Sequence, residues 1–100
     1  MTMLHILNKS PLEKSSLDSV LRVAKSGALL LIEDAVYAAT RGNAAEPKVR
    51  EAMARMKVYA LAPDLQARGM ADRVIDGVAT VDFDGFVDLV VEHPNCQSWL

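Results

Sequence analysis

The segment "ALLLIED", residues 28 to 34, decides the fold that this sequence predicts. Four large aliphatic residues follow one another in it without polar alternation, which is the pattern of a strand covered on both faces. Open parallel sheets bury their strands in this way because crossover helices pack on both sides. We therefore expect a buried parallel strand here, with helices and strands alternating before and after it.

Three further segments have the composition of short strands, and each ends in polar turn residues or proline. They are "MLHIL" (3–7), "MKVYALA" (56–62) and "VATVD" (78–82). The first must stop at "NKSP" (8–11), because proline continues neither a strand ladder nor a helix. At the other end of the chain, "QSWL" (97–100) is long enough only for an edge strand or a docked tail.

A first helix is expected from Ser15. Ser15 and Asp18 resemble a capping box, and Gly27 supplies the stop. One face of this helix is apolar at the spacing i, i+3, i+4 and i+7, which is typical of an amphipathic helix. The residues on that face are Leu17, Val20, Leu21 and Ala24.

Four more helices are expected in the later part of the chain. They cover "AVYAATR" (35–41) after an Asp34 cap, a segment from Glu46-Pro47, "DLQARG" (64–69), and a last helix between an Asp82 cap and Pro94. In the last helix we expect the large apolar side chains to face inward. These are Phe83, Phe86, Val87 and Val90.

The repeated alternation of strand and helix predicts an α/β fold with an open, mainly parallel sheet and helices on both faces. The chain has 100 residues, of which 51% are hydrophobic. This is enough for one core, so we expect a single domain over residues 1–100. Sheets of this class place working residues at the carboxyl ends of their strands.

Composition excludes several classes of function. The net charge is −2 and the basic residues are dispersed, so no direct nucleic-acid binding is expected. No secretory leader is recognised, and the longest apolar run is far shorter than the roughly 20 residues that span a membrane. We therefore expect a cytoplasmic protein without a membrane segment.

Carboxylates follow three of the expected strands, at Asp34, Asp64 and Asp82. Such a set could hold magnesium and a phosphoryl group, which leaves a metal-dependent or phosphoacceptor enzyme as one alternative. Capping of the following helices explains the same positions, and we favour it because Asn8-Lys9 replaces an acid after the first strand. No phosphate-binding glycine loop is present, so nucleotide binding of that type is unsupported. We expect neither a cofactor nor a metal.

Two histidines are candidates for chemistry of another kind. His5 lies between Leu4 and Ile6, so its side chain points to the opposite face of the strand. With no cysteine or second histidine nearby, we interpret it as a partly buried, hydrogen-bonded residue. His93 lies at a helix end beside Pro94, where an imidazolium would stabilise the helix dipole, and we interpret it as a cap.

Cys96 is the single cysteine, so no internal disulfide can form. In an exposed terminal segment it could carry a persulfide or attack one, but a reactive thiolate needs a helix start or a nearby cation. His93 is the only such group in its local sequence. We favour an inert Cys96 and assign no catalytic residue, with Cys96 kept as the candidate.

Five segments, in order, resemble the TusB/DsrH family. They are "LHILNKSP", "EDAVYAA", "KVYALAPDLQARG", "VDFDGFVDLVVEHP" and the terminal "QSWL". The resemblance covers residues 3–100 and implies a DsrE-like subunit of a heterohexamer with two copies of each chain. The implied partners are TusC/DsrF-like and TusD/DsrE-like subunits, with a TusE/DsrC-like protein as sulfur acceptor.

The resemblance implies a sulfur relay in which this chain is an accessory, non-catalytic subunit. The principal sulfur-carrying cysteine belongs to the TusD/DsrE partner, and the first-helix cysteine of the DsrH branch is replaced by Val20, which cannot hold sulfur. We expect a role towards 2-thiolation of the tRNA wobble uridine. A DsrH-type subunit for sulfur oxidation and a stand-alone thiol carrier using Cys96 are the alternatives.

Three methionines, Met53, Met56 and Met70, are candidates for a partner interface. The helical spacing of Met53 and Met56 fits a position in the core better than one in an interface.

Overall fold

The computed structural model describes residues 3–10, 16–24 and 26–99. Its strands are β1 (Met3–Leu7), β2 (Ala28–Leu31), β3 (Lys57–Leu61), β4 (Ala79–Val81) and β5 (Asn95–Trp99). Its α-helices are α1 (Ser16–Val23), α2 (Glu46–Met53), α3 (Ala62–Ala67) and α4 (Phe83–Glu92). Two 3₁₀-helices, η1 (Glu33–Ala39) and η2 (Ala71–Arg73), complete the described elements.

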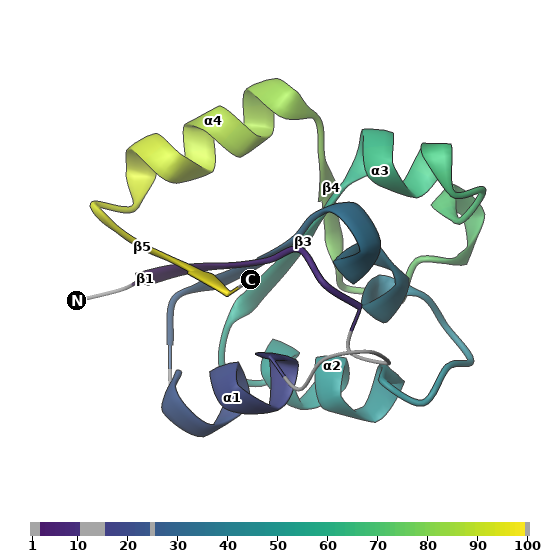
Figure 1. Ribbon diagram of the computed structural model, residues 1–100, viewed down its shortest axis with the longest axis horizontal. Helices are drawn as coiled ribbons and strands as arrows, with labels where there is room; N and C mark the ends of the chain where they lie inside the picture. The colour runs from purple at the N-terminus through teal and green to yellow at the C-terminus, as the bar shows by residue number, and fades with distance from the viewer. Residues whose placement is uncertain (1–2, 11–15, 25, 100) are drawn as a thin grey trace.

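The five strands form one parallel sheet in the order β4-β3-β2-β1-β5, which confirms the predicted α/β class. All four residues of β2 are buried at the centre of the sheet, as the "ALLLIED" segment predicted. The terminal segment is an edge strand, because β5 pairs with β1 from Met3↔Asn95 to Leu7↔Trp99. The first and last described strands therefore lie side by side at one side of the sheet (Figure 1).

Helices cover the two faces of the sheet unequally. α1 and α2 lie on one face and α4 lies on the other (Figure 1). Because strand side chains alternate, Leu29 and Leu31 point into a large core with α1, α2 and η1, whereas Leu4 and Leu30 point towards α4. The α4 side holds a much smaller set of buried residues.

Gly27 makes the turn into β2 at a φ of +107°. A Cβ atom at this position would lie 2.3 Å from the Met3 carbonyl oxygen. Glycine is therefore required both for the backbone conformation and for the close approach of β1. The helix stop predicted at Gly27 lies beyond the end of α1, and the predicted Ser15 cap lies outside the described residues.

The inward orientation predicted for the apolar residues of α4 was wrong for three of the four. Phe83, Val87 and Val90 are exposed, whereas Phe86 packs against the small core and Leu89 is buried there. The spacing of apolar residues defines one face of a helix, but it does not predict whether that face packs on the sheet or is exposed to solvent.

The three methionines that the sequence offered for an interface, Met53, Met56 and Met70, belong to the large core or pack against it. Met56 is buried, and Met53 and Met70 pack against the same cluster. Within the described ranges, no helix is long and apolar enough to cross a membrane.

Candidate functional site

Asp64 lies at the carboxyl edge of the sheet, in the first turn of α3 directly after β3. Its carboxylate oxygen Oδ2 accepts a hydrogen bond of 2.6 Å from the backbone N–H of Glu33, the first residue of η1. Glu33 has a φ of +50°, an uncommon conformation for a residue with a side chain. Asp64 therefore satisfies an amide at the start of a neighbouring helix across 31 residues of sequence.

Arg68 joins Asp64 to Asp34. The guanidinium Nη2 lies 2.9 Å from Asp34 Oδ1, and Nη1 lies 3.8 Å from Asp64 Oδ1. The predicted caps at Asp34 and Asp64 were therefore wrong, because both residues lie inside the first turns of η1 and α3, and the cap positions are Ile32 and Leu61. The i, i+4 spacing of Asp64 and Arg68 is the local sequence signal for this ion pair.

Asp82 caps α4 as predicted, with its Oδ1 accepting a 2.8 Å bond from the Gly85 amide. The Arg68 guanidinium forms ion pairs with the carboxylates of Asp34 and Asp64. Across the residues that the structure describes, no group of three or more His, Cys, Asp or Glu side chains is arranged to hold a metal ion. At the carboxyl edge, ion pairs and a hydrogen bond therefore join η1 to α3, and we call this contact the junction of η1 and α3.

His5 is buried in β1 and bonds to the other end of the chain. The indole Nε1–H of Trp99 donates a 3.2 Å hydrogen bond to His5 Nδ1, and the two ring centroids lie 6.1 Å apart. Nδ1 accepts this bond, so the ring is neutral with its proton on Nε2. Burial also lowers the pKa of His5. These contacts fit the hydrogen-bonded structural role that the sequence predicted.

The predicted cap at His93 is present at the end of α4. Its ring Nδ1 lies 2.8 Å from the Leu89 carbonyl oxygen, and its backbone N–H donates to the same oxygen. The neighbouring Cys96 is exposed on β5, and its thiol donates to the His93 carbonyl at 3.6 Å. This contact is with a carbonyl rather than with the imidazole, and a carbonyl dipole does not stabilise a thiolate.

Val20, which the family resemblance matched to a cysteine of the DsrH branch, lies on α1 and is fully buried in the large core. Any side chain at this position would be shielded from a sulfur donor in the folded chain. Two properties of this position therefore oppose sulfur relay: valine has no sulfur atom, and its side chain is buried.

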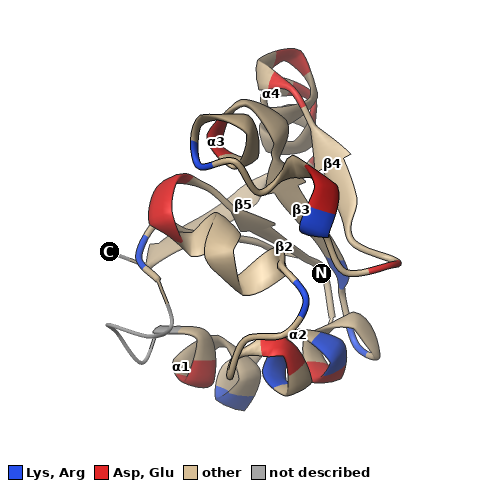
Figure 2. Ribbon diagram, turned by 90° about the vertical axis from the view of Figure 1, so that its right-hand side faces the viewer, with Lys and Arg blue, Asp and Glu red and all other residues tan. Residues whose placement is uncertain are grey.

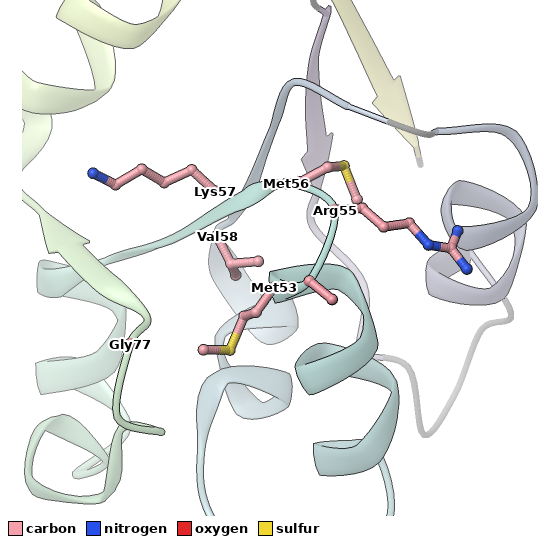
Figure 3. A pocket seen from close by; sticks show the side chains of 7 residues that line it. Met53, Arg55, Met56, Lys57, Val58 and Gly77 are labelled. Carbon is pink, nitrogen blue, oxygen red and sulfur yellow. The ribbon is translucent and has the colours of Figure 1, made fainter.

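A hollow of about 400 Å³ opens where α2 leads into β3 (Figure 3). Met53, Met56 and Gly77 line it, and the sequence did not indicate it. Its two cationic neighbours point away from one another: Arg55 bonds to Glu51, and the Lys57 ammonium lies 5.7 Å from the Tyr59 ring centroid. The hollow lies at the amino end of β3, the edge opposite to the one where such sheets place their chemistry.

A second hollow of about 250 Å³ lies beside the loop after η1. Arg41 and Arg73 border it, and the Asn43 side chain closes the loop by donating to the carbonyl oxygens of Tyr37 and Thr40. Arg41 is already bonded to the Asp72 carbonyl oxygen at 3.1 Å. The polar groups of this loop mainly bond to one another.

Comparison with known proteins connects this geometry to a family. The family model described as "DsrH like protein" matches residues 9–96. Protein TusB of Pectobacterium parmentieri is 40% identical over 98 residues, covering 97% of this chain and all of the relative. Protein TusB of Escherichia coli (strain K12 / DH10B) is 39% identical with the same coverage.

Among solved structures, the YchN protein from E. coli has a TM-score of 0.81 at 20% identity, covering 99% of this chain and 100% of that chain. A likeness at this identity shows the fold alone. The family model and the TusB relatives, in contrast, extend over almost the whole sequence at substantial identity. The chain therefore belongs to the TusB/DsrH family, as its motifs indicated.

Proposed function

We propose that this chain is an accessory subunit of a cytoplasmic sulfur-relay complex that passes persulfide sulfur towards 2-thiolation of the tRNA wobble uridine. The complex would contain TusC/DsrF-like and TusD/DsrE-like subunits, two copies of each chain, and would deliver sulfur to a TusE/DsrC-like acceptor. Family membership over residues 9–96 supports a sulfur-relay subunit. The relatives named TusB favour the tRNA branch.

The observation that carries the accessory role is the setting of the one cysteine. Sulfur passes between proteins when a thiolate attacks the outer sulfur of a persulfide. A new S–S bond forms at the attacking cysteine while the donor S–S bond breaks, and the donor leaves as a thiolate. The Cys96 thiol donates to the His93 carbonyl oxygen, a neutral acceptor that supplies none of the positive charge a reactive thiolate needs.

The proposal predicts that Cys96→Ser leaves sulfur delivery intact. The test is the 2-thiouridine content of tRNA in cells that lack the chain and are complemented with wild type or Cys96→Ser. We expect the deletion to lower 2-thiouridine and both complementing chains to restore it to the same level, because the sulfur travels on partner cysteines.

Two other outcomes would contradict the proposal in different ways. Failure of a well-expressed Cys96→Ser chain would assign the relay to Cys96 and favour a thiol carrier. Unchanged 2-thiouridine after deletion, together with lost oxidation of reduced sulfur, would assign the chain to the sulfur-oxidation branch.

A further inference from the structure

α4 has an apolar stripe that this chain does not cover. Phe83 is 61% exposed, Val87 is 59% exposed and Val91 is 76% exposed. With Val90, these residues follow the spacing i, i+4, i+7 and i+8, which places them on one face of a helix that turns by about 100° per residue. The side of α4 that meets the sheet is a different one, formed by Phe86 and Leu89.

An acidic row lies next to this stripe. Asp84, Asp88 and Glu92 follow the spacing i, i+4 and i+8, so they share the neighbouring face of the helix. None of the three forms an ion pair with any residue in the described part of the chain. Residues 74–100 contain five acidic residues and no Lys or Arg, and Figure 2 shows acidic but no basic positions on α4.

The sheet surface on the α4 side is also incompletely covered. Ile6, Ile32 and Tyr59 lie on this side and are only half-buried. The exposed stripe is therefore part of a thinly covered half of the molecule rather than a set of isolated apolar residues. Extended apolar surface with a polar border is typical of an interaction site.

We propose that the apolar stripe of α4 (Phe83, Val87, Val90 and Val91) binds a partner subunit whose contact surface has an apolar centre bordered by Lys or Arg. The apolar centre would remove the four side chains from water, and the basic border would pair with Asp84, Asp88 and Glu92. This inference rests on the proposed function, since it assigns one surface of the subunit to assembly.

The acidic row favours a protein partner with a basic border over a second copy of this chain or an anionic membrane. A second copy of the chain would bring two acidic rows together, and like charges across an interface oppose association. An anionic lipid surface would repel the same row, since helices that lie on membranes carry Lys and Arg on their polar face. A basic-bordered protein surface satisfies both the apolar and the acidic face.

The first test compares two exposed valines on opposite sides of the sheet. Val91→Asp places a charge in the stripe, and Val23→Asp places the same charge on α1, where Val23 is 62% exposed. Each variant is co-expressed with the TusC-like and TusD-like subunits of the same organism, and assembly is measured by native mass spectrometry and titration. We expect Val91→Asp to weaken assembly at least about tenfold, because burying the charge would be costly, and Val23→Asp to assemble as wild type does.

The second test addresses the acidic row. Asp88→Lys with Glu92→Lys reverses its charge, and Asp76→Lys is the control because Asp76 is exposed outside α4. We expect the double variant to assemble more slowly and to lose the salt dependence that wild type shows, whereas the control keeps both. Thermal unfolding of the free chains confirms that all variants fold.

The outcomes separate this inference from the proposed function. If wild type assembles and Val91→Asp assembles equally well, the stripe is not the interface, while the relay proposal stands. If Val91→Asp abolishes only self-association, or only binding to anionic lipid vesicles, the occupant is a second copy or a membrane and the inference is overturned. If wild type does not assemble with either subunit, both proposals fail.

Discussion

The contact between His5 and Trp99 connects the first strand to the last at the level of single residues. Trp99 donates to a buried, neutral His5 across 94 positions of sequence. The sequence indicated a hydrogen-bonded His5 but not its partner, because no local spacing relates residues so far apart. The parallel pairing of β1 and β5 brings them together.

This contact predicts a pH dependence of stability. Burial lowers the pKa of His5 below its ordinary value of 6.5, so the unfolded chain binds a proton at a pH at which the folded chain does not. The free energy of unfolding should therefore be fully retained above pH 6.5 and should fall as the pH drops from 6.5 towards the pKa of the folded state. Urea unfolding at a series of pH values measures this loss.

His5→Gln is the variant that isolates the effect, and His93→Gln is its control. Both remove an imidazole, but only the first removes the buried one. We expect His5→Gln to lose less stability on acidification than wild type, and His93→Gln to keep the wild-type loss. The same acid sensitivity in wild type and His5→Gln would show that the buried imidazole does not set it.

At the level of elements, the junction of η1 and α3 depends on a contact between residues far apart in the sequence, which a local sequence pattern does not predict. The strands and most helices were predictable because apolar runs and helical spacing are local signals. The hydrogen bond that satisfies the first amide of η1 could not be predicted in this way, since the acceptor for the Glu33 amide is Asp64 in another helix. Sequence rules for caps consider only residues at the start of the same helix.

This arrangement predicts unequal effects of two aspartates that both contact Arg68. Asp64→Ala should lower the free energy of unfolding by about 1–2 kcal/mol, because it leaves the Glu33 amide without its carboxylate acceptor. Asp34→Ala should cost less than about 1 kcal/mol, because it breaks only an ion pair with an exposed carboxylate. Denaturant unfolding measures both, and equal costs would contradict the capping role of Asp64.

At the level of the whole molecule, the two faces of the sheet have different roles. The core with α1, α2 and η1 holds most of the buried side chains, including Val20. The α4 side is thinly covered and acidic. The alternation of strands and helices predicted helices on both faces of the sheet. It could not distinguish a helix face that the chain buries from one that it leaves exposed, because both contain the same residue types.

In the proposed complex this subunit supports assembly, and the sulfur travels on the cysteines of its partners. The tagged chain is purified from its native cell, loaded with persulfide sulfur, and analysed by native mass spectrometry followed by mass analysis of each subunit. We expect two similar-sized partner subunits in equal amounts, with the added sulfur atom on a partner cysteine. A chain that purifies alone and carries the added sulfur on Cys96 would contradict it.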